Sequence, residues 1–174
     1  RQPVRNYPLT TLDGRVSSRV AGVYHAVPRH SFIVALQDLA ELWEISYDPR
    51  AEPIHDGLVH DYRMGEGLAK PGFLGVRRTP LDEPLDGFFF DKSYRQAVGS
   101  TRAHGASPPQ GQVIQLDVRR RIASFPLPGV PEMASAIQLT QDGVNLLAIP
   151  NQEDGCVTVV DMQTWQVVPP IALV

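Results

Sequence analysis

The chain has 174 residues, of which 43% are apolar, and a formal net charge of −3. The apolar fraction is enough for a packed core, which excludes a disordered chain, and the charge argues against a dedicated nucleic-acid-binding protein. With 14 glycines and 16 prolines, the composition favours many turns over long helices. The sequence has no apolar run of 18 residues, so we expect no transmembrane helix.

The first predicted elements lie in residues 20–48. This segment reads as two strands joined by a turn at residues 28–30, followed by a third strand. Residues 49–72 then form an insertion rich in His, Asp, Arg, Gly and Pro, which interrupts the strand pattern. After it, residues 87–101 predict a hairpin whose turn lies near Asp91.

The second half of the chain repeats one pattern, with an offset of 44 residues from Gly111 to Gly155. GQVIQLDVRRRIASFPLP aligns with GCVTVVDMQTWQVVPPIA, and each copy is a strand, a tight turn led by Asp117 or Asp161, and a second strand. Residues 136–151 predict the hairpin between the two copies. A period of about 40–45 residues with four strands per unit is typical of β-propeller blades.

These elements predict an all-β protein in which residues 1–174 are part of a single β-propeller domain. Its three four-stranded blades cover about residues 19–75, 84–128 and 134–174. Three blades do not close a ring, and a propeller closes to protect its strand edges, so we expect a fragment of a longer protein. An open β-sandwich is the alternative fold. We expect Cys156, the single cysteine, to be an inert core thiol.

The insertion contains two His-Asp pairs, at 55–56 and 60–61, which raise the alternative of a metal site. Residues five apart on a strand face opposite sides and no third ligand stands at a suitable spacing, so we predict no metal. The region is also cationic, because Arg63, Arg77 and Arg78 stand near aromatic residues. Guanidinium groups bind carboxylates through paired hydrogen bonds. This pattern suits a flat, apolar ligand with acid groups, although ordinary solvated arginines would give it too.

Three stretches resemble a known family: RHSFIVALQDLAELWEISYDP, DGLVHDYRMGEG and PGFLGVRRTPLDEPLDGFFFDKSYR. They are similar to the NirF-type heme d1 biosynthesis proteins, which are relatives of the d1 domain of cytochrome cd1 nitrite reductase. The resemblance implies an eight-bladed, d1-type β-propeller of which this chain is a part. It also implies a periplasmic protein of denitrification that acts late in the synthesis of heme d1.

The resemblance further implies that heme d1 or its dihydro precursor binds in the central channel of the propeller. Arg77 and Arg78 are then the first candidates to bind carboxylates of this ligand. Arg63, Tyr62 and His60, on the inserted loop, are further candidates. Cytochrome cd1 nitrite reductase and other heme d1 maturation proteins are the implied partners.

The chain departs from the nitrite reductases at their two distal histidines. Where the reductases have LHDGG, this chain has PLDGFFF, with Leu85 and Asp86, and Glu132 stands near the other histidine, in LPGVPEMAS. A leucine has no proton to give and an ionised carboxylate only accepts, so we do not expect nitrite reduction. Asp86 and Glu132 are instead candidate catalytic residues, as a general base or to position a precursor. The alternative is that both have structural roles only: Asp86 caps a turn, and Glu132 is a solvated loop residue.

Three functions fit this resemblance. The first is a tetrapyrrole-binding protein that binds and modifies a heme d1 precursor. The second is a dihydro-heme d1 dehydrogenase, an oxidoreductase that completes the acrylate side chain. Because this chain has no Cys-x-x-Cys-His motif, we expect it to carry no covalent heme c. The third is a carrier or scaffold that passes heme d1 to the nitrite reductase, because a fold alone does not fix a function.

Overall fold

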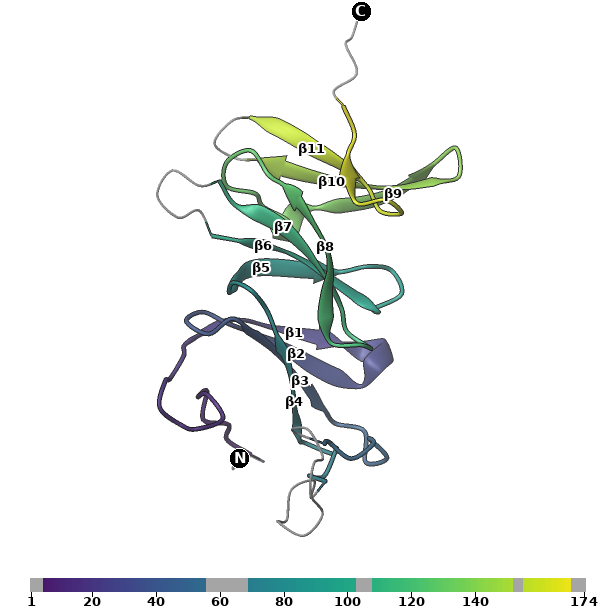
Figure 1. Ribbon diagram of the computed structural model, residues 1–174. Helices are drawn as coiled ribbons and strands as arrows, with labels where there is room; N and C mark the ends of the chain where they lie inside the picture. The colour runs from purple at the N-terminus through teal and green to yellow at the C-terminus, as the bar shows by residue number, and fades with distance from the viewer. Residues whose placement is uncertain (1–4, 56–68, 103–107, 152–154, 170–174) are drawn as a thin grey trace, which may run out of the picture. The chain divides into compact units, whose positions relative to one another are not determined.

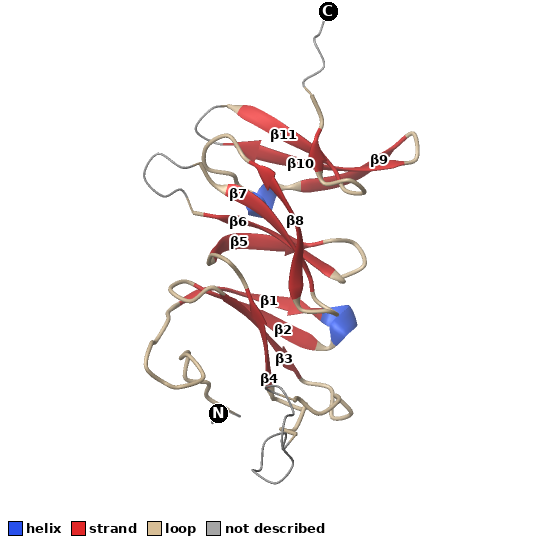
Figure 2. Ribbon diagram, in the orientation of Figure 1, coloured by secondary structure: helices blue, strands red, loops and turns tan. Residues whose placement is uncertain are grey.

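The computed structural model describes residues 5–55, 69–102, 108–151 and 155–169. The chain forms three four-stranded antiparallel sheets, each with its strands in chain order (Figure 1). The helices of the described part are single 3-10 turns, η1 (Val27–Arg29) and η3 (Met133–Ser135), as Figure 2 shows. None of these is long or apolar enough to cross a membrane. The predicted all-β fold is thus confirmed.

The strands of the first sheet are β1 (Val20–Ala26), β2 (Ser31–Leu36), β3 (Glu41–Ser46) and β4 (Val76–Pro80). Those of the second sheet are β5 (Leu85–Phe90), β6 (Gln96–Thr101), β7 (Gln110–Gln115) and β8 (Arg120–Pro126). Those of the third sheet are β9 (Ile137–Gln141), β10 (Val144–Asn151), β11 (Cys156–Asp161) and β12 (Gln166–Val167). The predicted turns at 28–30 and near Asp91 do join consecutive antiparallel strands.

The chain divides into two compact units, residues 1–80 and 81–174. The first unit contains the first sheet, whose fourth strand, β4, pairs with β3 after the insertion. The apolar core of this unit lies on one face of the sheet and consists of Val34, Leu36, Trp43 and Ile45. Tyr7 and Leu9 pack against it from the preceding segment, and the Tyr7 hydroxyl donates to the Leu74 carbonyl at 2.9 Å.

In the second unit, the second and third sheets pack face to face (Figure 1). Their shared core consists of Val98, Val113, Phe125, Leu127, Met133, Leu147, Ile149, Val160 and Trp165. The rings of Phe125 and Trp165 stack at an interplanar angle of 7°, and so tie β8 to the turn before β12. Met133 in this core belongs to η3, so the same packing fixes that helical turn between the sheets.

The two glycines that begin the repeated segments serve different purposes. A Cβ on Gly111 would overlap the ring of Phe125, so this glycine lets the aromatic core close against β7. Gly155 has open space around it but a φ of +59°, a left-handed conformation that glycine adopts at no steric cost. The repeat that identified the blades therefore marks tight packing in one copy and a backbone turn in the other.

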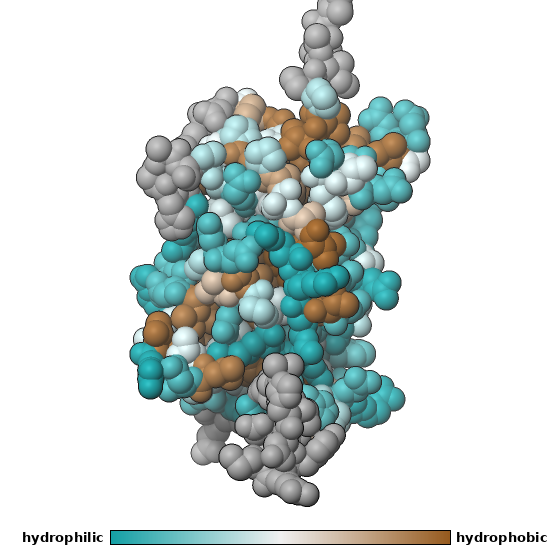
Figure 3. Space-filling view, in the orientation of Figure 1, coloured by the Kyte–Doolittle hydropathy of each residue, from teal (hydrophilic) through white to brown (hydrophobic). Residues whose placement is uncertain are grey.

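The second face of the third sheet is open. It forms an apolar hollow of about 970 Å³, and Figure 3 shows apolar side chains at the surface of this sheet. Cys156 lines this hollow at the start of β11 and is exposed, so the prediction of a core thiol is wrong. Cys156 has the strand parity of Thr158 and Val160, which are buried, but it stands at the first position of β11, where the core no longer covers it.

Leu147, at the middle of β10, is fully buried in the core between the second and third sheets. We predict that Leu147→Ala lowers the free energy of unfolding by about 2–5 kcal/mol, because apolar burial is lost and a cavity remains. The control is Leu139→Ala on neighbouring β9, where the side chain is 38% exposed; it should cost about 1 kcal/mol or less. Urea unfolding followed by tryptophan fluorescence measures both, and equal losses would contradict this placement of the core.

Candidate functional site

The candidate site lies at the start of β5, where Asp86 stands in a β-bulge. Leu85 pairs with Thr101 and Gly87 with Ser100, so Asp86 is the extra residue between two ladder pairs. A bulge leaves its extra residue unpaired and re-aims its side chain, and bulges are frequent beside active sites. The Asp86 side chain is 51% exposed, which leaves its carboxylate accessible to a ligand.

The first sheet has the same bulge without the carboxylate. In β1 the extra residue is Ala21, which is followed by Gly22 just as Asp86 is followed by Gly87. The two bulges hold equivalent places, at the start of the first strand of each sheet. Because alanine is sufficient in one of them, the bulge itself does not require the carboxylate of Asp86.

Arg102, directly after β6, holds Asp86 in place. Its Nε donates a hydrogen bond to Asp86 Oδ1 at 2.7 Å, and its side chain is 33% exposed. The sequence analysis missed this residue, because an arginine that follows a strand has no local pattern of its own. Only the register of β5 against β6, which pairs Leu85 with Thr101, brings Arg102 to the bulge.

Glu132 is the N-cap of η3, in the connection from β8 to β9. Its Oε1 accepts a hydrogen bond from the Ala134 N–H at 3.2 Å, and its own N–H donates to the Pro150 carbonyl at 2.9 Å. A side-chain acceptor at this position satisfies a backbone N–H that the short helix leaves without a partner. Glu132 is therefore half-buried and fixed at a helix end, and is more than a solvated loop residue.

The structure brings the two candidate carboxylates onto adjoining segments. A Cβ placed on Gly87 would lie 3.8 Å from the Cβ of Met133, so η3 lies directly beside the start of β5. Gly87 follows Asp86 and Met133 follows Glu132, so the segments that carry the two acidic residues adjoin each other within the second unit. Their catalytic role stays a prediction.

Arg77 and Arg78 are neighbours on β4, and side chains at consecutive strand positions point to opposite faces. The Arg77 guanidinium donates to the Glu52 carbonyl. The Arg78 guanidinium lies over the Trp43 ring, 4.4 Å from its centroid, and pairs with Glu41 at 3.1 Å. The structure therefore does not bring the two guanidinium groups together, and their binding of ligand carboxylates stays a prediction.

The other predicted binding residues, His60, Tyr62 and Arg63, lie outside the described residues. Within the described ranges there is no group of three or more His, Cys, Asp or Glu residues that could hold a metal ion. The apolar hollow on the third sheet is also a poor match for a ligand with acid groups, because no charged residue lines it.

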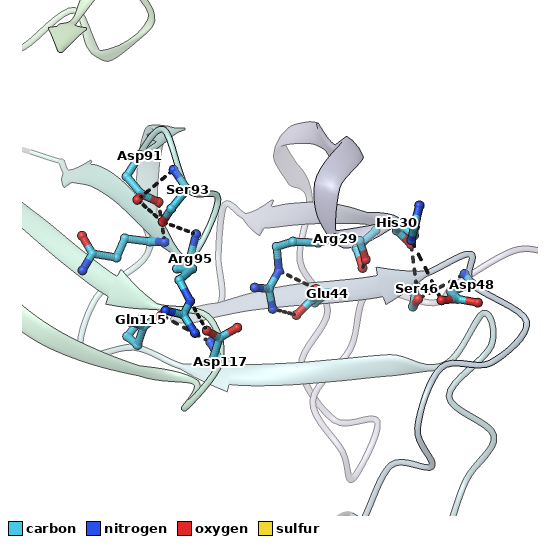
Figure 4. Close-up of polar contacts among 12 residues, drawn as sticks. Arg29, His30, Glu44, Ser46, Asp48, Asp91, Ser93, Arg95, Gln115 and Asp117 are labelled. Carbon is cyan, nitrogen blue, oxygen red and sulfur yellow. Dashed lines mark hydrogen bonds and ion pairs between the residues drawn. The ribbon is translucent and has the colours of Figure 1, made fainter. Parts of the chain in front are cut away.

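An aromatic and histidine cluster lies at the opposite end of β1 from its bulge. Nε2 of His25 is 2.8 Å from the Tyr47 hydroxyl, and His30 Nδ1 is 3.9 Å from Asp48, as seen in Figure 4 for the second pair. The Arg50 backbone N–H donates to Asp48 and holds the pKa of that carboxyl below its usual value. These contacts close the turns that flank β2 and β3, and we assign them no ligand.

Comparisons with known proteins find a curated protein and a solved structure that resemble this chain. The chain is 38% identical over 151 residues to the dihydro-heme d1 dehydrogenase of Pseudomonas aeruginosa, in a match that covers 86% of this chain. The chain is homologous to part of a dihydro-heme d1 dehydrogenase. A solved structure, dihydro-heme d1 dehydrogenase NirN in complex with DHE, is similar with a TM-score of 0.73 and 36% identity over 95% of this chain. No family model matches the chain.

These similarities confirm the resemblance to d1-domain proteins and the predicted propeller fold, since the solved NirN is a d1-type β-propeller. The relative that they name is the dehydrogenase, which the sequence analysis held as an alternative to the NirF type. The chain spans 25% of the curated protein and 30% of the solved one. It therefore corresponds to a part of these larger proteins.

Arg78 lies over Trp43 and donates to both Glu41 and the Thr10 carbonyl. We predict that Arg78→Ala lowers the free energy of unfolding by about 1–3 kcal/mol, because it removes the stacking and leaves two acceptors without this donor. The matched control is Arg77→Ala, where a half-buried side chain loses one hydrogen bond. Thermal unfolding compares the two variants, and a larger loss from Arg77→Ala would contradict the structural role of Arg78.

Proposed function

We propose that this protein acts in heme d1 biosynthesis and binds dihydro-heme d1 in the central channel of a longer propeller. The observation that carries the proposal is the bulge carboxylate of Asp86, which the backbone does not require and which adjoins the segment of Glu132. The homologous P. aeruginosa protein is named for dihydro-heme d1, and the solved NirN was found in complex with DHE.

We further propose that the reaction is dehydrogenation of a saturated acid side chain to an acrylate. This step removes two protons and two electrons and forms one carbon–carbon double bond. The carboxylate of Asp86 accepts one proton as general base, and Glu132 accepts the other. The two electrons leave one at a time through the bound iron tetrapyrrole and reduce two molecules of an oxidised one-electron carrier protein.

Reduction of nitrite is not part of this proposal. In this chain Leu85 and Asp86 stand in the segment that holds a histidine in the nitrite reductases, and neither supplies the proton that a histidine gives to nitrite. From the resemblance we propose instead a periplasmic protein whose product passes to cytochrome cd1 nitrite reductase.

The test of the proposed function is a titration of the protein with dihydro-heme d1, in the presence of a one-electron acceptor, with absorption spectra recorded over time. We expect the Soret band to shift on binding and the spectrum then to convert to that of heme d1. A shifted band that stays constant would contradict the dehydrogenation and leave a carrier. A spectrum identical to that of the free tetrapyrrole would contradict the binding.

Replacement of the two carboxylates tests their roles separately from binding. We predict that Asp86→Asn lowers the rate of conversion by about 10²–10⁴-fold, the range expected for loss of a general base. Glu132→Gln keeps an oxygen that can cap η3, so it should slow conversion without unfolding the protein. The control is Asp117→Asn, after β7, which changes the same group outside the site. Conversion by Asp86→Asn at the rate of this control would exclude Asp86 as the base.

A further inference from the structure

We propose that Arg102 is a positioning residue with two simultaneous tasks: its Nε holds Asp86, and its Nη groups bind a carboxylate of the substrate. The inference rests on the proposed function and extends it to a residue that the resemblance did not indicate. A guanidinium at this place explains how a site near acidic residues can bind a ligand that itself carries carboxylates.

The hydrogen bond from Arg102 to Asp86 uses one of the five N–H groups of the guanidinium. Its Nε donates to Asp86 Oδ1 at 2.7 Å, and within the described ranges its two Nη groups have no partner. Other arginines of this chain use two N–H groups on one carboxylate. Arg19 donates to Asp38 through Nε and Nη2, and Arg29 does the same to Glu44 (Figure 4). Arg102 thus binds Asp86 through Nε alone. Its two Nη groups can bind a second carboxylate through paired hydrogen bonds.

The position of Asp86 gives this contact a purpose. The extra residue of a bulge has no partner in the strand ladder, so its side chain needs another group to fix its direction. The Nε of Arg102, directly after β6, donates the hydrogen bond that fixes it. A guanidinium that holds the base on one side and the substrate acid on the other sets the distance between them, and such positioning contributes strongly to rate.

Charge supports the same arrangement. The segments of Asp86 and Glu132 adjoin each other, and negatively charged side chains near a binding site disfavour the approach of an anionic group. The positive guanidinium of Arg102 offsets this repulsion where the substrate acid would enter. A lysine would keep the charge, but its single ammonium group could not replace a planar guanidinium that donates from Nε to one carboxylate and from its Nη groups to another.

The chain contains a matched control for this pair. Arg95 also donates through Nε to an aspartate, Asp117, at 3.2 Å, and it lies before β6 where Arg102 lies after it (Figure 4). This pair is on the same sheet as the candidate site but at the other end of β6. Arg95→Ala therefore removes an ion pair of the same kind without touching the bulge.

The experiment measures the dissociation constant for dihydro-heme d1 and the conversion rate for wild type, Arg102→Ala, Arg102→Lys and Arg95→Ala. We expect Arg102→Ala to weaken binding by about tenfold or more, the loss of charge-assisted hydrogen bonds, and to slow conversion further. Arg102→Lys should recover part of the affinity but not the rate, because charge is restored without the fork. Arg95→Ala should match wild type.

The outcomes separate this inference from the proposed function. If wild type and Arg102→Ala bind equally and convert at the same rate, the role of Arg102 is overturned while the proposed function stands. If Arg102→Lys restores both quantities in full, Arg102 supplies charge alone and the positioning role is overturned. If wild type does not bind dihydro-heme d1, the proposed function fails, and this inference fails with it. Circular dichroism of the variants confirms that each is folded.

Discussion

The apolar core between the second and third sheets determines where the candidate site lies. Met133 belongs to this core and also to η3, so packing of the two sheets places that helical turn beside the start of β5. Glu132, one residue earlier, is carried to the neighbourhood of Asp86 by the same contact. The apolar interaction that stabilises the unit therefore also places the segment of Glu132 beside the segment of Asp86.

The repeat makes it possible to separate what the backbone needs from what the chemistry needs. Two sheets begin with the same bulge, and a glycine follows the extra residue in both. The position is an alanine in β1, whereas in β5 it is an aspartate, which accepts a hydrogen bond from Arg102 at the end of the next strand. A side chain that differs between equivalent positions, and is held by its own partner, points to function more strongly than a charged residue in an isolated loop.

The sequence predicted the parts of this protein that depend on local pattern. The turns around Pro28 and Asp91 follow from short-range turn chemistry, and the resemblance singled out Asp86 and Glu132. Features that depend on strand register were not predictable. The pairing of Arg102 with the bulge, and the use of Arg78 in stacking on Trp43, both arise from residues distant in the chain. Cys156 was predicted to lie in the core because it shares a face with the buried Thr158 and Val160, and the strand pattern does not reveal that the core ends before the first residue of β11.

The most direct test of this account is a crystal structure of the protein with dihydro-heme d1 bound. The account predicts that an acid side chain of the tetrapyrrole lies within hydrogen-bond distance of Arg102, with the carbon to be oxidised next to the carboxylate of Asp86. A tetrapyrrole seated away from the start of β5, for example in the apolar hollow on the third sheet, would contradict it.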